Sequence, residues 1–385
     1  MGKISKSITT ITLMLLVSII FFEIAFTNGK GLAGAFIRNV KSPLAPIEES
    51  LNSNLPFRNL FLDGYSELLK VERRIEYTDS KGTIVRGQDG QLFVIEKEVP
   101  QEELQKEAGN VNELAGYCIQ RSVPFYYIQV PWKTSSDTEN VPVGAGDFTD
   151  LNANYFILCL NSDDICIVDL RKNYQGGDFH YVTDHHWKTE TCFDAVQVIE
   201  RDLEKKFPSL RNENASDKSR YLFETKHKVF LGSIGRRIGE PYSGLDDFTY
   251  IYPKFETNLH YQHIKDNTVE IDKSGTFKDV MFSDPEESDY YCSVLNNSYC
   301  EMRVENFDAE NNLKCLLISD SYGRPFTAYM SLYFKNFINI DTQSGRFRKD
   351  IYEFIDNEKP DIVIMMFNSG MLGTNEVFDF HEKGN

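Results

Sequence analysis

Basic residues are scarce in this chain of 385 amino acids. Lysine and arginine together number 41 against 58 aspartates and glutamates, so the formal net charge is −17. A charge of this sign repels phosphate backbones at long range, and the sequence contains no basic patch that would overcome the repulsion. We therefore expect no nucleic acid among the partners of this protein.

Cysteine patterns typical of metal sites are also missing. The seven cysteines include no Cys-x-x-Cys pair and have no companion histidine at metal-ligand spacing, so a zinc site is not indicated. Their odd number argues against a disulfide scaffold. Because 41% of the residues are hydrophobic and 13% are aromatic, the chain can build a full-sized core without either aid. We expect a globular protein that needs no metal and no cofactor.

Only one long hydrophobic run occurs. Residues 8–26 read ITTITLMLLVSIIFFEIAF behind two lysines, and this length crosses most of a bilayer. No small-x-small cleavage site follows, which favours an uncleaved signal-anchor over a removed signal peptide. We expect residues 1–28 to be a single-pass segment in the cell membrane and residues 29–60 to be a juxtamembrane linker. Residues 61–385 would then form an extracytoplasmic domain.

Strand and helix signals alternate in two parts of this domain. Strands are predicted at 123–131, 165–170, 314–319, 338–341 and 361–367, and helices at 101–121, 148–160, 188–207, 325–337 and 347–355. Such alternation predicts parallel pairing, and the fold is best described as one α/β sandwich whose sheet is assembled from two sequence halves. Between the halves, residues 208–312 consist of short aromatic pieces broken by turns. We expect a β-rich insertion there.

A serine stands at the carboxyl end of one predicted strand, in the segment CLLISDSYGRP. Ser321 lies two residues past that strand and just before a helix, where open parallel sheets hold reactive groups. A serine at such a turn can attack a carbonyl, and its own backbone N–H can help to hold the developing oxyanion. Taken alone the pattern is weak, because serines often stand at strand-to-helix turns as simple helix caps.

Histidines cluster in the segment TDHHW, residues 183–187. Residues two apart in an extended or turning segment can face the same side, so Asp184 can accept a hydrogen bond from His186 and fix its tautomer. The other ring nitrogen is then available to take a proton from a serine. Two alternatives remain open: a metal site that adds His180 and His185, and a purely structural cluster.

TDHHW followed about 130 residues later by ISDSYG resembles the DHHW family of bacterial proteins. That family is similar to the alginate O-acetyltransferases, in which an SGNH-like domain carries a D-x-H-W motif upstream of a serine motif. The resemblance covers most of residues 60–370 and implies an SGNH/flavodoxin-like sandwich. It also implies that Asp184 is the acid, His186 the base and Ser321 the nucleophile.

Further candidates surround these three residues. Asn368, Arg324 and Tyr322 are candidate oxyanion or substrate-binding groups, although Asn368 is equally explained as a polar cap and Gly370 stands where an SGNH asparagine is expected. Ordinary SGNH hydrolases carry their acid and histidine near the C-terminus, which makes Asp379 and His381 rivals. We expect the tail that bears this pair to be frayed.

The resemblance favours acetyl transfer onto cell-surface or exopolysaccharide glycans through an acyl-enzyme. The acyl donor would be delivered by a membrane-bound acyltransferase, since the domain lies outside the cytoplasm. Two alternatives stay open at this point. An esterase or deacetylase would use the same three residues with water as acceptor, and a non-catalytic glycan-binding or assembly protein would use the aromatic residues of the insertion as a stacking surface.

Overall fold

The computed structural model describes residues 58–79, 81–285, 288–295, 300–344, 346–374 and 377–380. The chain forms two compact units, one ending at Arg73 and one beginning at Arg74. In the first unit the structure describes one helix, α3 (Arg58–Val71). Among the described residues no helix has the length and apolar character needed to cross a membrane. The anchor predicted at residues 8–26 lies outside the described part of the chain.

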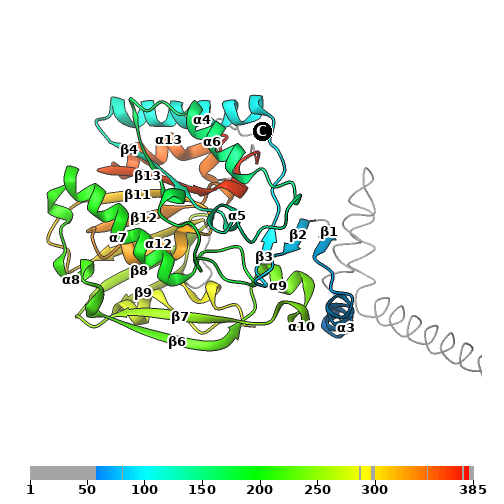
Figure 1. The fold of residues 1–385 in the computed structure, drawn as a ribbon. Helices are drawn as coiled ribbons and strands as arrows, with labels where there is room; N and C mark the ends of the chain where they lie inside the picture. The colour runs from blue at the N-terminus through cyan, green and yellow to red at the C-terminus, as the bar shows by residue number, and fades with distance from the viewer. Residues whose placement is uncertain are drawn as a thin grey trace, which may run out of the picture. The chain divides into compact units, whose positions relative to one another are not determined.

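An eight-stranded sheet forms the centre of the second unit (Figure 1). Its strands are β4 (Phe125–Val130), β5 (Ile165–Asp169), β8 (Leu259–Lys265), β9 (Thr268–Gly275), β10 (Glu301–Asn306), β11 (Lys314–Ser319), β12 (Asn336–Ile340) and β13 (Ile362–Asn368). The order across the sheet is β5-β4-β13-β11-β12-β10-β8-β9. Strands β5 to β12 in this order are parallel neighbours, whereas β10, β8 and β9 pair antiparallel. The predicted parallel sheet from two sequence halves is confirmed.

Helices cover both faces of the parallel strands. Helices α4 (Gln101–Gln120), α6 (Thr149–Cys159) and α13 (Arg346–Glu358) pack on one face, and α7 (Thr189–Lys206) and α12 (Gly323–Met330) on the other (Figure 1). Side chains of β11 alternate accordingly, since Leu316 and Ile318 face the first layer while Cys315 and Leu317 face the second. Burial on both faces explains why the strands read as continuous apolar runs.

The insertion extends the main sheet. Strands β6 (Tyr221–Phe230) and β7 (Asp246–Pro253) form a separate antiparallel pair, but β10 joins β12 and brings β8 and β9 with it. The β8–β9 hairpin turns at Asp266 and Asn267, whose φ angles of 48° and 62° suit these two residue types. The predicted β character is therefore confirmed, while the pairing with β12 had no local signal in the sequence.

Smaller elements connect these layers. A three-stranded sheet consists of β1 (Glu76–Asp79), β2 (Gly82–Arg86) and β3 (Leu92–Val94). The short helices are α5 (Lys133–Ser136), α8 (Glu213–Ser216), α9 (Ser233–Ile238), α10 (Glu240–Ser243) and α11 (Phe277–Met281). The 3₁₀ turns are η1 (Leu170–Lys172), η2 (Pro208–Leu210), η3 (Lys218–Arg220), η4 (Tyr291–Ser293), η6 (Thr342–Ser344) and η7 (Ser369–Met371).

Helix α12 is shorter than the sequence predicts. It ends at Met330, whereas the apolar pattern predicts a helix as far as residue 337. The side-chain amide of Asn306 donates to the carbonyls of Ser331 (3.3 Å) and Leu332 (3.2 Å), just past the end of the helix. These carbonyls thus find their hydrogen-bond donor on a strand rather than in a further helical turn. The prediction was wrong here because the group that satisfies these carbonyls comes from β10.

The C-terminal tail is packed rather than frayed. Phe378 and Phe380 are buried beside α6 and β13, and the side-chain amide of Asn110 donates to the carbonyl of Phe378 at 2.8 Å. The expectation of a loose tail was therefore wrong for residues 377–380. His381 lies outside the described residues.

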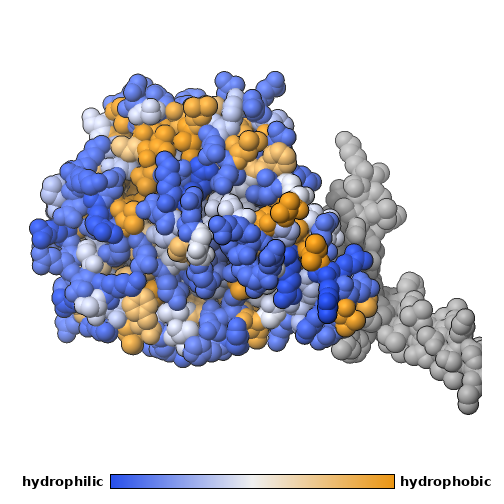
Figure 2. Space-filling model, viewed as in Figure 1, coloured by the Kyte–Doolittle hydropathy of each residue, from blue (hydrophilic) through white to orange (hydrophobic). Residues whose placement is uncertain are grey.

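The visible surface is mainly hydrophilic, with separate hydrophobic patches (Figure 2). Large apolar side chains that remain exposed include Leu151 and Leu158 on α6. Scattered exposed residues of this kind are normal in folded proteins and need no functional explanation.

Candidate active site

Ser321 lies in the turn between β11 and α12, at the carboxyl edge of the parallel strands. Asp320 orders this turn, since one of its carboxylate oxygens accepts the backbone N–H of Tyr322 at 2.9 Å. Its other oxygen accepts the backbone N–H and the side-chain amide of Asn368, at 2.9 and 2.6 Å. Burial raises the pKa of Asp320 to about 7, and the donors from Asn368 and Tyr322 oppose this rise. The serine turn is thereby tied to the end of β13.

Close packing of α12 against β11 depends on Gly323. A Cβ atom at this position would lie 1.9 Å from Ser319 Oγ and 2.6 Å from Ser319 Cβ. Only glycine lets the first turn of α12 approach the strand end so closely. The serine is therefore positioned by a strand, a tight turn and a helix packed directly on one another.

Asp184 and His186 lie in an irregular loop between η1 and α7. An isolated bridge between His180 and Trp187 closes the loop, and Trp187 is fully buried beneath it. Asp184 and His186 are themselves only 2% and 6% exposed. Although the loop has no regular secondary structure, its two polar side chains are enclosed.

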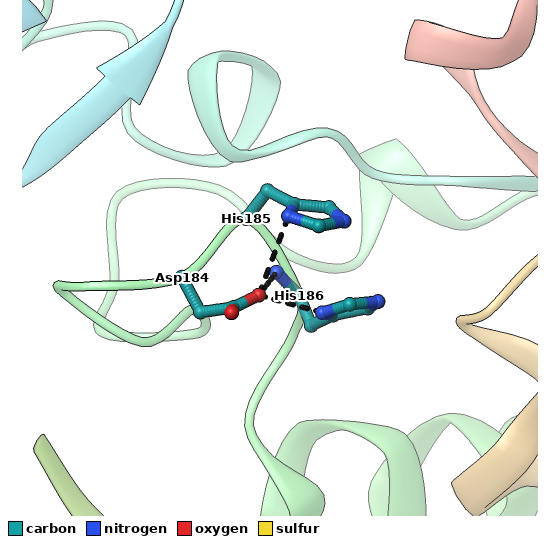
Figure 3. Close-up of side chains that lie close together, drawn as sticks. All are labelled: Asp184, His185 and His186. Atoms are coloured by element: carbon teal, nitrogen blue, oxygen red, sulfur yellow. Dashed lines mark hydrogen bonds and ion pairs between the residues drawn. The ribbon is translucent and has the colours of Figure 1, made fainter. Parts of the chain in front are cut away.

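Three side chains form a continuous hydrogen-bonded relay. His186 Nδ1 and Asp184 Oδ1 are 2.6 Å apart, as Figure 3 shows, and His186 Nε2 and Ser321 Oγ are 2.7 Å apart. The second carboxylate oxygen of Asp184 accepts the backbone N–H of Ser233 at 2.6 Å. The structure thus brings together the three residues singled out in the sequence, two of which are 135 positions apart.

Charges within the relay suit a neutral histidine beside an ionised aspartate. Burial alone would raise the pKa of Asp184, but His186 and His185 hold it well below its usual range. Burial lowers the pKa of His186, and Asp184 opposes this by favouring the protonated ring. At neutral pH, His186 can therefore accept a proton from Ser321 and share the resulting charge with Asp184.

Two tyrosines hold the ring of His186. Tyr291 stacks on it with ring centroids 3.8 Å apart, and the Tyr291 hydroxyl donates to the backbone carbonyl of Ser321 at 3.1 Å. Tyr322 lies on another side, 5.1 Å away, and its hydroxyl donates to the carbonyl of His185. The imidazole is thus fixed by packing as well as by its hydrogen bonds.

A cavity of about 290 Å³ opens at the relay. It is lined by Asp184, His185, His186, Ser233, Arg236, Asp289, Tyr291, Cys292, Ser321, Arg324, Asp341 and Gln343. Arg236 is paired with Asp289 at 2.5 Å, and Arg324 approaches Cys292 Sγ at 3.6 Å. Burial raises the pKa of Asp341 to about 6, although Arg324 opposes this. The wall around Ser321 therefore carries charged groups of both signs.

A metal site from the same histidines fits this geometry less well. Within the described part of the chain, potential ligand atoms of Asp184, His185 and His186 lie within 4.8 Å of one another. Two of these atoms already bond to each other in the relay, and His185 Nδ1 bonds to Ser233 Oγ at 2.9 Å. His180 points elsewhere, since its Nε2 donates to the carbonyl of Pro131 at 3.2 Å. A metal would have to replace the relay, so the observed arrangement favours proton transfer.

Solved structures of known proteins share this fold. Bacillus cereus PatB1, in a structure with a sulfonyl adduct, matches over 80% of this chain and 100% of its own, with a TM-score of 0.65 and 18% identity. A DHHW family protein from Eubacterium siraeum matches over 80% and 98%, with a TM-score of 0.62 and 17% identity. The O-acetyltransferase domain of Pseudomonas putida AlgJ matches more loosely, over 75% and 92%, with a TM-score of 0.46 and 14% identity.

This chain has the fold of a DHHW family protein. The resemblance indicated by TDHHW and DSYG is thus confirmed, and at these low identities it is a likeness of fold. No family model matches the sequence, and no curated protein matches it.

Within this DHHW-type fold the remaining candidates occupy different places. Arg324 lines the cavity, as its candidate role requires. Asn368 does not line it, because its amide nitrogen is bonded to Asp320 and its oxygen accepts the N–H of Gly370 at 2.8 Å. Tyr322 is fully buried and supports the loop of His185. This geometry gives Asn368 and Tyr322 supporting positions rather than contact with a substrate.

Asp379, the described member of the rival pair in the tail, does not line the cavity at Ser321. Asp379 lies between the buried residues Phe378 and Phe380, which pack beside α6, whereas His186 occupies the position beside Ser321. Sequence reasoning also missed Ser233 and Tyr291, both of which contact the relay. Neither belongs to a recognisable motif, so no local signal identifies them.

Proposed function

We propose that this protein transfers an acyl group, acetyl in the expected case, onto hydroxyl groups of cell-surface or exopolysaccharide glycans. The observation that supports this most strongly is the unbroken relay from Asp184 through His186 to Ser321 at the wall of a cavity. The sulfonyl adduct in the PatB1 structure adds support, because such an adduct forms where a nucleophile attacks sulfur. The choice of a glycan as acceptor and of acetyl as the transferred group rests on the resemblance of the TDHHW and DSYG motifs to the DHHW family.

The proposed reaction has two steps. His186 Nε2 takes the proton of Ser321 Oγ while this oxygen attacks the acyl carbonyl, and the same proton then passes to the leaving group of the donor. In the second step a glycan hydroxyl attacks the acyl-enzyme and gives its proton to His186, which passes that proton to Ser321 Oγ as the serine leaves. Arg324 and the backbone N–H of Ser321 are the groups proposed to hold the oxyanion. The donor would come from a membrane-bound acyltransferase, and the predicted anchor would keep both proteins in one membrane.

Release of p-nitrophenol from p-nitrophenyl acetate tests the proposal, with the full chain purified in detergent. Ser321→Ala and His186→Ala should each lower the rate by about 10³-fold or more, since residues of one relay act as a unit. Asp379→Ala should retain the parent rate, because Asp379 is not part of the proposed relay. A loss of activity in this variant would favour the rival pair in the tail. A parent without activity, or activity indifferent to Ser321, would contradict the proposal.

An acceptor decides between transfer and hydrolysis. The assay is repeated with oligosaccharides, and mass spectrometry follows whether the acetyl group appears on a sugar or as free acetate. Acetylated sugar supports the transferase. Acetate alone would make the protein an esterase, and saturable sugar binding without turnover would favour the non-catalytic alternative.

A further inference from the structure

The loop of Asp184 and His186 is held on its carbonyl side by one buried lysine. Lys133 follows the end of β4 in helix α5 and is 2% exposed. Its Nζ donates to the carbonyl oxygens of Tyr181 at 2.5 Å, Val182 at 2.8 Å and Asp184 at 3.2 Å. Because an ammonium group has three N–H donors, this loop engages all of them.

An aspartate holds the same loop on its N–H side. Asp246 is the first residue of β7 and is 6% exposed. Its carboxylate accepts the backbone N–H of Val182 at 2.8 Å, and the backbone N–H and hydroxyl of Thr183 at 2.7 and 2.6 Å. A buried cation and a buried anion therefore bind opposite polar groups of one irregular segment.

Neighbouring groups complete the enclosure. The carbonyl of Thr183 accepts the backbone N–H of Gly235 at 2.8 Å, and the backbone N–H of Gly232 donates to the Thr183 hydroxyl at 2.8 Å. In a helix or a sheet these backbone groups would bond to other backbone groups of the regular structure. Here they depend on side chains and on the turn into α9, which makes the conformation of the loop a property of its surroundings.

Keeping an ammonium group at this position has a free-energy cost. Burial lowers the pKa of Lys133 to about 7, while Asp246 and Asp184 oppose the shift. Neither Lys133 nor Asp246 lines the cavity, so a role in contacting substrate does not explain their presence. What the two side chains share is the segment that carries Asp184 and His186.

We propose that Lys133 and Asp246 are positioning residues, which together set the orientation of the Asp184–His186 pair without touching the substrate. The inference rests on the proposed function for its catalytic meaning. Its structural content, the geometry of the hydrogen bond between His186 and Asp184, can be measured without any substrate.

Lys133→Met in the full chain tests the proposal, because methionine keeps the length of the side chain and removes all three donors. The first measurement is the far-downfield proton NMR signal of His186 Nδ1–H bonded to Asp184, which should weaken or disappear. The second is the rate at which phenylmethylsulfonyl fluoride modifies Ser321, followed by mass spectrometry. A loss of about 100-fold in this rate is expected, since a misplacement of about 1 Å costs that much.

Matched variants separate positioning from general stability. Lys314→Met is the control, because Lys314 is a half-buried lysine that donates to the carbonyl of Glu358 at 2.7 Å, at the opposite end of β11. It should leave the NMR signal and the labelling rate unchanged. Lys133→Gln, which keeps two donors, is the milder variant to be judged by the same criteria if Lys133→Met does not fold.

Asp246→Asn and the double variant sharpen the test. If both residues act through one loop, the double variant should lose little more than the worse single variant. A folded Lys133→Met or Lys133→Gln protein that keeps the signal and labels at the parent rate overturns the inference. A parent that shows the signal but never labels at Ser321 would instead count against the proposed function alone.

Discussion

The two halves of the relay are held by different means. Ser321 is placed by regular structure: a buried strand ends, a turn is tied to the next strand by Asp320, and a helix packs on the strand end through Gly323. His186 is placed by an irregular loop whose polar groups bond to side chains from β7 and α5 and to a backbone N–H at the turn into α9. The backbone of the serine turn is held mainly by packed regular structure, and the backbone of the histidine loop is held mainly by a few buried polar contacts.

This difference predicts how each half responds to change. A packed strand-turn-helix unit spreads strain over many neighbours, so defects there should appear mainly as lost stability. A loop held by a few buried polar side chains has few neighbours to compensate when one of them is lost, so defects there should appear mainly as lost activity. Substitutions on the two sides can therefore separate stability from function.

The largest effect is expected for Asp184→Asn, which changes the residue that bonds to His186 in the irregular loop. The asparagine cannot stabilise the protonated His186 and favours the wrong tautomer, so p-nitrophenyl acetate turnover should fall by about 10⁴-fold. Thermal unfolding should shift by only a few degrees, because the side chain is replaced by one of equal size. A rate within tenfold of the parent would contradict the relay.

A pair of glycine substitutions compares the two halves directly. At Gly232 a Cβ atom would lie 2.3 Å from Asp184 Cβ, so Gly232→Ala should displace the carboxylate and lower activity by about 100-fold. Gly323→Ala brings a Cβ atom to 1.9 Å from Ser319 Oγ and should mainly destabilise the fold, by about 3 kcal/mol. Turnover and thermal unfolding measured on both variants test this. The comparison fails if Gly232→Ala loses stability and keeps activity.

The pH dependence of turnover reports on the histidine. Burial lowers the pKa of His186, partly opposed by Asp184, and the base acts in its unprotonated form. Activity should therefore rise with pH through an apparent pKa below the ordinary value of about 6.5 and remain level above it. A rise centred above 6.5 would show that His186 is not buried as described, or that another group is the base.

The smallest effect on function is expected for Asn306→Ala, at the far end of α12. Its amide satisfies the carbonyls of Ser331 and Leu332, so its loss should cost about 1–3 kcal/mol of stability. Turnover at 25 °C should stay at the parent level, because the residue lies away from the serine turn. A parallel loss of activity would show that the strand and helix around Ser321 cannot lose stability without losing activity.

Sequence reasoning succeeded where function depends on local order and failed where it depends on distant partners. The strand ending before Ser321 was predicted because its apolar run and the following turn are contiguous. The pairing of Asp184 with His186 was predicted because the two residues lie only two positions apart in the chain. Lys133 and Asp246 were missed because each lies about 50 or more residues from the loop that it holds. The same reason explains Asn306 and the attachment of β10 to β12.

The place of β13 in the sheet has a consequence for how the chain reaches its active form. Among the described residues this strand is the last along the chain, yet it lies between β4 and β11 in the middle of the parallel strands. Until residue 368 has left the ribosome, β4 and β11 have no common neighbour and the sheet is divided into two parts with open edges. Such non-local closure is slow and exposes edges that can pair wrongly. We therefore expect the domain to remain unassembled during synthesis and to complete its sheet in a late step, so that a truncation before β13 would abolish folding rather than trim the domain.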